Sequence, residues 1–359
     1  MKTRILGIAL IVLAGLAAVN LYQAFARAFG GDEHHGAYAI ASASSDADVD
    51  AQDFDFDFDF DFDFDFDFDE AVSASDQSRE IVIDERFNVS EGQDLFIDVQ
   101  HADVEIETRS GADQARIVVT ISSRNMDRAM ERFEAMDWKT YKDGDRVVVR
   151  SEMPRRTNWN LKMKIDVVAL IPDHFNLDVQ STHGDVSAGS LWGNAEIKTT
   201  HGDLDLASLN GDRAEIRTTH GDVESGDLMV KRLEIRTTHG DIDLGDVTSD
   251  VFSATTTHSD VQIEELTGRS EIRTTHGDVR IRVQNTDGMD IRTSHGDVSL
   301  HVPSDFRADL DLRAAKVNLP MSANFDGELK KKSAYGALNG GGVNVEIATS
   351  HGDISLRNR

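Results

Sequence analysis

The sequence predicts an all-β protein built as a β-solenoid of 18–19-residue coils, with one capping helix near its N-terminal end. The main observation is a recurring phrase, most complete at residues 234–244, which read EIRTTHGDIDL. Successive copies are separated by 18, 19, 19, 19, 18 and 19 residues, measured between His183, His201, His220, His239, His258, His276 and His295. Self-similarity at a fixed period is typical of stacked repeat architectures.

Each copy predicts a strand, a tight turn and a second strand. Side chains alternate along a strand, so Ile235 and Thr237 share one face and Glu234 lies on the other. Gly240 gives the turn its backbone freedom, and Asp241 can accept hydrogen bonds from nearby backbone N–H groups. One copy carries Ser259 in place of the glycine. We expect that turn to be strained or of another type.

The spacing distinguishes a solenoid from an antiparallel meander of hairpins. The connecting segments, such as 207–212 and 265–268, differ in sequence while the period hardly changes. A meander tolerates loops of different length, whereas a coil must match the perimeter of its neighbour, and this favours the solenoid over residues 176–359. His351 follows His295 by 56 residues. We expect degenerate coils at 310–319 and 333–339 in that interval and a change of path at 340–342.

Residues 80–175 predict an N-terminal β region interrupted by a helix over 125–138. Short alternating apolar runs indicate strands, whereas Met126, Ala129, Met130 and Phe133 recur at helical spacing. Asn125 is a candidate N-cap. We expect this helix to cover the open end of the β body and its apolar stripe to be core.

Residues 1–26 have the pattern of a secretory signal peptide. Lys2 and Arg4 precede an apolar run over 5–19, and a small-x-small site follows at 24–26. An uncleaved anchor is the alternative, because residues 21–25 lengthen the apolar run. We therefore expect the body to lie outside the cytoplasm, in the periplasm or at the cell surface. The chain has no cysteine, which excludes disulfides, thiolate metal sites and a cysteine nucleophile.

Residues 27–79 predict a disordered acidic linker that contains an unusual tract. From 53 to 69, nine aspartates alternate with eight phenylalanines. The composition favours a linker kept soluble by its charge. Two alternatives remain: an extended strip, with every Phe on one face, that docks on a sheet edge or a partner, and calcium binding by the Asp face, which lacks an enclosed cage of oxygen ligands.

Stacked coils would align equivalent residues into rows. One row holds the seven histidines named above, and the row beside it holds Asp185, Asp203, Asp222, Asp241, Asp260, Asp278 and Asp297. Imidazole and carboxylate groups suit zinc, copper or nickel, so both rows are candidate metal ligands. The alternative is structural: turns whose histidines stack and bond neighbouring carboxylates. Because no enclosed tetrahedral shell is predicted, we expect no cofactor, with a divalent metal as the alternative.

The repeated chemistry argues against an enzyme. A catalytic site needs a singular cluster of acids, bases or nucleophiles, whereas here carboxylate and imidazole recur in every coil. No nucleophile elbow, phosphate loop or zinc-protease helix motif is present. The net charge of −28 disfavours nucleic acid and anionic lipid as partners.

These observations predict a non-catalytic structural or adhesive module of the cell envelope. Its partner would be an envelope or surface protein or a glycan, and an uncleaved N-terminal segment would be its contact with the membrane. The alternative is a periplasmic metal-binding or envelope-stress-sensing protein that uses the His and Asp rows.

Three features resemble the putative-adhesin family of bacterial β-strand-repeat proteins, a domain family without an assigned function. They are the repeated Thr-x-His-Gly-Asp-Val phrases, a strand ending in proline at 167–172, and the ending 338–342 followed by 347–356. The resemblance covers about residues 80–359. It implies an extracytoplasmic β-solenoid without known catalytic residues. Such proteins often carry Ser or Asn where this chain has His, and the Asp-Phe tract is foreign to their pattern.

Overall fold

The computed structural model describes residues 78–152, 162–320 and 324–358. The chain divides into two units, 1–71 and 72–359, and the second is described here by itself. The predicted signal segment 1–26 and the Asp-Phe tract lie outside the described residues, as does the linker up to residue 77. Within the described ranges the chain forms twenty-four strands and one α-helix.

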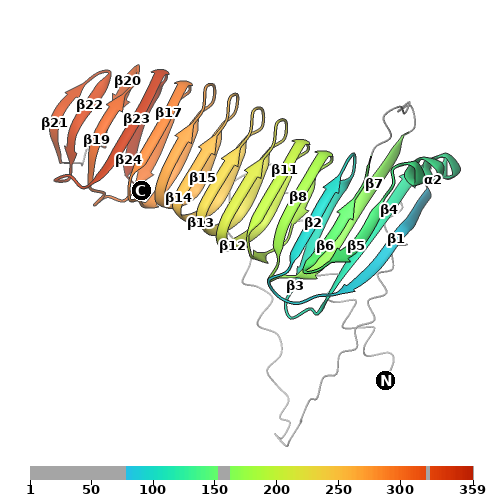
Figure 1. Ribbon diagram of the computed structural model, residues 1–359. Coiled ribbons are helices and arrows are strands. Elements are labelled where there is room, and N and C mark those ends of the chain that lie inside the picture. Colours follow the sequence, from blue (N-terminus) through green and yellow to red (C-terminus); the bar gives the residue numbers. More distant parts are fainter. Residues whose placement is uncertain (1–77, 153–161, 321–323, 359) are drawn as a thin grey trace, which may run out of the picture. The chain divides into compact units, whose positions relative to one another are not determined.

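Parallel pairing between successive coils builds the body of the protein (Figure 1). Ile216, Ile235, Ala254 and Ile272 occupy equivalent positions in four consecutive coils. A meander of hairpins would pair these strands antiparallel, so the predicted solenoid is confirmed. The strands of these central coils are β12 (Leu204–Arg217), β13 (Val223–Arg236), β14 (Ile242–Thr255) and β15 (Val261–Arg273).

The stack of coils begins before residue 176. Strands β2 and β3 pair in parallel with β8 and β9, which continue into β11 and β12. Residues 80–175 therefore contribute a coil of the solenoid itself. Outside it, β6 and β7 pair in parallel with β2 and β3, and β1, β4 and β5 add antiparallel pairs. The strands concerned are β1 (Ser78–Asn88), β2 (Asp94–Val99), β3 (Asp103–Arg109), β4 (Gln114–Ser123), β5 (Lys139–Asp143), β6 (Arg146–Arg150), β7 (Met163–Pro172), β8 (Asn176–His183), β9 (Val186–Ala188), β10 (Leu191–Trp192) and β11 (Ala195–His201).

At the C-terminal end the order of coils in space differs from their order in the chain. Strands β23 and β24 pair directly with β17 and β18, and they separate these from β19 and β20. The degenerate coil expected at 310–319 is confirmed, because β19 and β20 pair in parallel with β23 and β24. The one expected at 333–339 is wrong, because β22 pairs antiparallel with β19 and β21. The strands are β16 (Val279–Asn285), β17 (Met289–His295), β18 (Val298–Val302), β19 (Ala308–Arg313), β20 (Lys316–Asn318), β21 (Phe325–Lys330), β22 (Ser333–Leu338), β23 (Val343–His351) and β24 (Asp353–Asn358).

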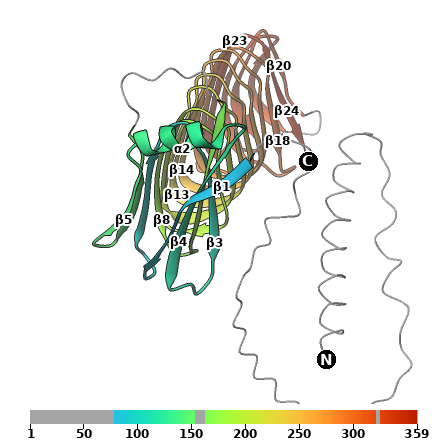
Figure 2. The ribbon, with the colours of Figure 1, turned by 90° about the vertical axis from the view of Figure 1, so that its right-hand side faces the viewer.

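Helix α2 (Met126–Ala135) lies at the N-terminal end of the stack, between β4 and β5 (Figure 2). The side-chain oxygen of Asn125 accepts the backbone N–H of Arg128 at 3.1 Å, which confirms the predicted N-cap. Ala129 and Phe133 are buried against the β core, as expected for the apolar stripe. No helix among the described residues is long and apolar enough to cross a membrane.

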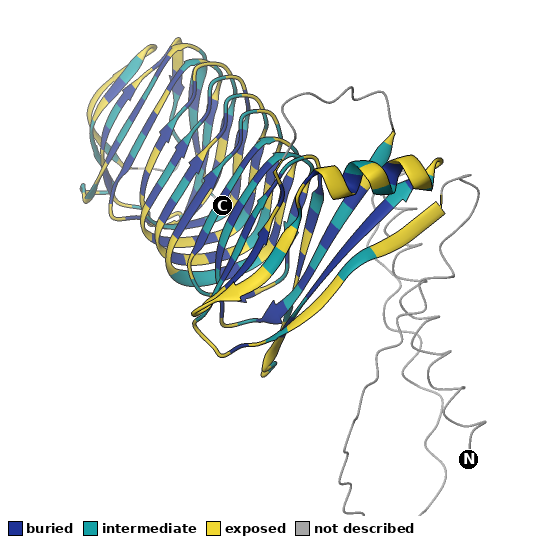
Figure 3. Cartoon of the chain, turned by 45° about the vertical axis from the view of Figure 1, so that its right-hand side comes forward, coloured by how far each residue is buried: buried dark blue, intermediate teal, exposed yellow. Residues whose placement is uncertain are grey.

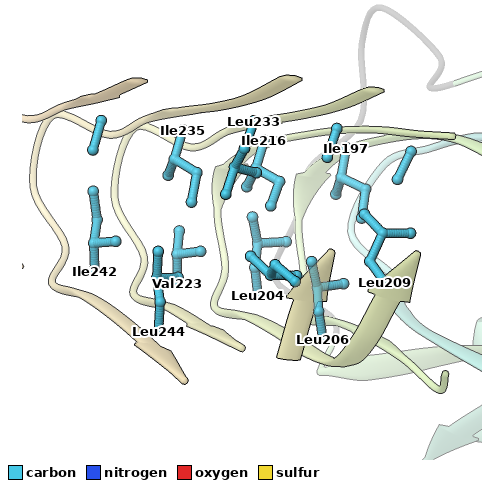
Figure 4. Close-up of a cluster of buried hydrophobic side chains, with 14 of the residues drawn as sticks. Ile197, Leu204, Leu206, Leu209, Ile216, Val223, Leu233, Ile235, Ile242 and Leu244 are labelled. Carbon is cyan, nitrogen blue, oxygen red and sulfur yellow. The ribbon is translucent and has the colours of Figure 1, made fainter. Parts of the chain in front are cut away.

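Alternating burial along each strand produces one continuous core (Figure 3). Ile197, Ile216 and Ile235 stack inside successive coils and face Leu204 and Val223 on the opposite wall of the coils (Figure 4). All five side chains are almost fully buried. Each contributes roughly 1.5–3 kcal/mol of transfer free energy to folding. The core therefore fixes the register that aligns the outward rows.

Candidate functional site

The predicted histidine row forms a continuous stack of imidazole rings along one corner of the solenoid. Neighbouring ring centroids lie 4.2–5.0 Å apart, and ring planes differ by at most 8°. The structure brings all seven predicted histidines together and adds one at each end. The histidine stack consists of His101, His183, His201, His220, His239, His258, His276, His295 and His351.

His101 is the member that sequence reasoning missed. It belongs to the phrase His-Ala-Asp-Val at 101–104, in which Ala102 replaces the glycine, and it lies 82 residues before His183. His101 adopts a positive φ of 56°, so the histidine rather than the next residue takes the left-handed conformation. The signal that could have found it is the His-x-Asp-Val core without the glycine.

The aspartate row joins each coil to the next. One carboxylate oxygen of Asp222 accepts the backbone N–H of Asp241 at 2.8 Å, and Asp241 does the same for Asp260 at 3.0 Å. Eight such bonds of 2.7–3.1 Å run without a break through Asp103, Asp185, Asp203, Asp222, Asp241, Asp260, Asp278, Asp297 and Asp353. The predicted backbone capping is confirmed, but its target lies in the next coil rather than within the turn.

The glycine beside each histidine is required by close approach of the coils. A Cβ atom at Gly202, Gly221 or Gly296 would lie 2.0–2.1 Å from the glycine carbonyl oxygen of the preceding coil. Ser259 replaces this glycine in one coil, without a positive φ. Its hydroxyl accepts the backbone N–H of Gly240 at 2.8 Å. In neighbouring turns, such as that of Gly221, a histidine carbonyl accepts the equivalent N–H. This turn is thus of another type, as expected.

The stacked geometry constrains what the two rows could bind. Nitrogen lone pairs lie in the plane of an imidazole ring, so parallel rings direct them side by side rather than toward one point. Zinc binds histidine nitrogen at about 2.0–2.1 Å, and two rings 4.8 Å apart, such as His201 and His220, would have to rotate to share one ion. Across the described ranges, no three or more His, Asp or Glu side chains converge as a metal cluster. A metal on these rows stays a prediction.

Burial lowers the pKa of the two histidines at the N-terminal end of the stack. For His101 the main cause is loss of solvent, followed by the positive charge of His183 and Arg132. For His183 loss of solvent is again first, followed by His201. This end of the stack therefore favours neutral imidazole rings.

Charged side chains on the outward face form paired rows. Glu215 and Glu234 lie in register in adjacent coils, as do Arg217 and Arg236. Arg217 lies 2.7 Å from Glu215 of its own coil and 3.9 Å from Glu234 of the next. The hydrogen bond from Arg213 is the main reason that the pKa of Glu215 is lowered. Opposite charges thus offset the stacking of like charges.

One surface hollow of about 310 Å³ lies over β3 and β7. Its lysine, Lys164, bridges Asp166 at 2.8 Å and Asp103 at 3.1 Å, and the bond to Asp166 is the main reason that its pKa is raised. Arg79 lies 3.9 Å from Asp166. Both basic side chains of the hollow are thus engaged with Asp103 and Asp166, and the lining also contains Glu105 and Asp185, so the hollow is acidic overall.

The outer surface carries an exposed pair of aromatic rings away from the histidine stack. His174 and Trp192 stack with their centroids 5.7 Å apart, and Trp192 is 52% exposed. Trp192 lies in register with Asn210, which in turn lies in register with the exposed Met229. This aromatic pair occurs once, unlike the repeated rows, and sequence reasoning did not single it out.

Comparison with family models identifies the chain. The model of the Toastrack DUF4097 domain matches residues 92–357. The chain belongs to the Toastrack DUF4097 family. The match begins before β2 and ends within β24, so it covers every coil described above. The family resemblance predicted from the repeated phrases is thereby confirmed. No curated protein matches the chain.

Solved structures give a more distant likeness. A putative adhesin from Bacteroides fragilis is 12% identical, with 79% of this chain and 98% of that chain covered at a TM-score of 0.41. A putative adhesin from Parabacteroides merdae is 10% identical, with 79% and 96% covered and a TM-score of 0.42. A putative lipid binding protein from Parabacteroides distasonis is 12% identical, with 78% and 96% covered and a TM-score of 0.29.

Proposed function

We propose that this Toastrack DUF4097 protein is a non-catalytic, extracytoplasmic module of the cell envelope that holds a surface protein or glycan. The observation that carries the proposal is the uniformity of its chemistry. Imidazole, carboxylate and guanidinium groups recur in register from coil to coil, and Lys164 in the hollow over β3 and β7 is engaged with Asp103 and Asp166. Repeated rows give many equivalent contacts, whereas catalysis needs one distinct constellation.

The exposed aromatic pair is the best candidate for a specific contact within this function. Trp and Tyr side chains are enriched at interfaces because they combine a large apolar area with a polar atom. Trp192 is half-exposed and supported from one side by His174. Its other side and its edge are therefore available to a partner.

Binding of the labelled full chain to isolated envelope fractions tests the proposal. We expect saturable binding that excess unlabelled chain displaces and that Trp192→Ser weakens by about tenfold, the loss of one aromatic anchor. Val251→Ser is the matched control, because Val251 is also about half exposed (47%) but lies apart from the aromatic pair. Absence of saturable binding, or turnover of envelope glycan or peptide by the chain, would overturn the proposal.

A metal-binding or stress-sensing role is the second candidate, and the histidine stack is the observation that favours it. Nine imidazoles with exposed or half-buried side chains lie along one corner, beside nine carboxylates. After rotation of two neighbouring rings, their nitrogens and an adjacent aspartate would suit zinc or copper.

Titration of the full chain with zinc and copper tests this second role. Binding with a Kd below about 100 μM, lost in the variant His220→Gln/His239→Gln, is expected if the rows hold metal. His174→Gln is the control, since His174 lies outside the stack. Binding that survives the double substitution, or no binding in this range, would eliminate the role.

A further inference from the structure

At the two ends of the solenoid, four strands pair with only one other strand. Within the described part of the chain, β1 pairs with β4 alone, β5 with β6, β20 with β24, and β21 with β22. A free edge presents unpaired N–H and C=O groups to any other extended chain. Proteins usually prevent such pairing by shortening the edge strand or by placing charge on its inward face.

Three of these edges carry such protection. Residues directly opposite each other in an antiparallel pair share a face. On β1, Glu80 lies opposite Ile121 and Glu85 opposite Ile117, both of which are fully buried. These two glutamates therefore lie on the inward face of the edge strand.

Strands β5 and β20 are also protected against pairing with another extended chain. On β5, Lys142 lies opposite the fully buried Val147, which again places a charge on the inward face. Strand β20 is three residues long, and the backbone N–H of Val317 within it already donates to the carbonyl oxygen of Lys331 at 2.9 Å. Neither edge can accept a long strand that continues the core.

Strand β21 has neither form of protection. Phe325 lies opposite Leu338 and Leu329 opposite Ala334, with Gly327 between them on the same face. Leu338 and Ala334 are buried, but Leu329 is 54% exposed. The apolar rows that contain Leu338 and Ala334 thus end at Phe325 and Leu329 on β21. Among the described residues, no further strand covers them.

We propose that the Asp-Phe tract of a second copy of this chain, residues 53–69, adds to the free edge of β21 as an extra strand. The tract alternates phenylalanine and aspartate over 17 residues. As a strand it would place all its phenylalanines on one face and all its aspartates on the other. The Phe face would continue the rows that end at Phe325 and Leu329, and the Asp face would remain in water. Edge addition of this kind combines main-chain hydrogen bonds with side-chain fit at alternate positions.

Charge favours one part of β21 over the other. Lys330, Lys331 and Lys332 lie at the turn between β21 and β22 and attract a chain of aspartates. Asp326 and Glu328 lie on the outward face of β21 and repel it. A shift of two residues leaves the pattern of the tract unchanged, so the tract can slide toward the lysine end while its phenylalanines stay on the inward face.

Reach favours a second copy over the same chain. Twelve strand-to-strand steps separate β1 from β20, roughly 55–60 Å at about 4.8 Å a step. The nine residues from Asp69 to Ser78 span at most about 30 Å. Residues 64–69 of the tract therefore cannot reach β21 of their own chain, because even residue 64 is tied to Ser78 by 14 residues that span at most about 50 Å. Docking between copies is head-to-tail, which produces open rows or closed rings.

Cross-linking between two single-cysteine variants tests the contact directly, because the chain has no cysteine of its own. Full chains carrying Leu329→Cys and Phe68→Cys are mixed and oxidised, and we expect a disulfide that joins one copy of each variant. In the double variant at high dilution we expect no intrachain disulfide. An intrachain disulfide would overturn the proposed second copy, and no disulfide in either case would overturn the docking.

Sedimentation velocity of the full chain tests the consequence. We expect concentration-dependent assembly that shifts at least tenfold to higher concentration in Leu329→Lys, which adds the missing inward charge. A tract of the same composition in scrambled order should show the same shift, because it loses the two-residue period. Tyr335→Lys is the control, since Tyr335 is 69% exposed on the outward face of β22. Assembly that persists in Leu329→Lys, or a wild-type chain that stays monomeric, would contradict the proposal.

Discussion

Replacement of Gly240 by alanine is expected to lower the free energy of unfolding by about 3 kcal/mol or more. A Cβ atom at Gly240 would lie 1.9 Å from the carbonyl oxygen of Gly221 and 2.5 Å from its carbonyl carbon. Both atoms are backbone of the preceding coil, where the N–H of Gly221 donates to His239. Relief of the clash therefore requires the parallel ladder to open. Chemical denaturation followed by far-UV circular dichroism measures the change.

Gly144→Ala provides the matched control. Gly144 has a φ of +58°, and no atom lies within 4 Å of a Cβ built there. Its substitution carries the conformational cost of a left-handed residue, about 1–2 kcal/mol, without a clash. If the two variants lost the same free energy of unfolding, the repeat would require glycine for its backbone conformation rather than for the close approach of the coils.

The sequence predicted those features that depend on local alternation and on period. The copy at residues 234–244 places Ile235 and Thr237 on the buried face and Arg236 outside, as the structure has them. A period that stays at 18–19 residues while its connecting segments vary already distinguishes coils from hairpins, because only coils share a perimeter. The N-cap of α2 was equally local, since Asn125 bonds a residue three positions away.

The order of the coils could not be predicted in this way. Each coil presents similar rows of apolar side chains and backbone groups to the coils on either side. The repeat that contains His351 therefore fits against His295, although the two histidines are 56 positions apart in the chain. The intervening strands β19 and β22 then pair antiparallel at the end of the stack. Sequence period records which segments are alike, not which of them become neighbours.

The hydrogen-bond partner of each aspartate could not be predicted from the sequence for a related reason. Turn chemistry alone suggests that Asp241 caps its own turn, whereas its carboxylate bonds Asp260 of the next coil. That acceptor role arises when two turns stack at the spacing of a parallel sheet. The aspartate thus stabilises the interface between coils, which in a repeat protein contributes much of the total stability.

Phe252 occupies a register position at which the size of the buried side chain differs from coil to coil. In register with it lie Leu233 on one side and Ser270 on the other. All three are almost fully buried, and Phe252 is one of the two phenylalanines with no exposed surface among the described residues. Its large ring therefore fills space that the small Ser270 leaves open.

Phe252→Ala is expected to lower the free energy of unfolding by about 3–5 kcal/mol, the range for loss of a buried aromatic ring with a cavity left behind. The neighbouring coils cannot close onto the cavity, because parallel pairing on both sides of β14 holds their separation. Denaturation by urea or guanidinium measures the loss.

Val251→Ala in the same strand is the control for Phe252→Ala. Val251 is 47% exposed, and its truncation should change stability by no more than about 0.5 kcal/mol. A loss below about 1.5 kcal/mol for Phe252→Ala would mean that the coils collapse around the missing ring. In that case the parallel ladder would adapt its spacing to the core, rather than the core filling a spacing that the ladder imposes.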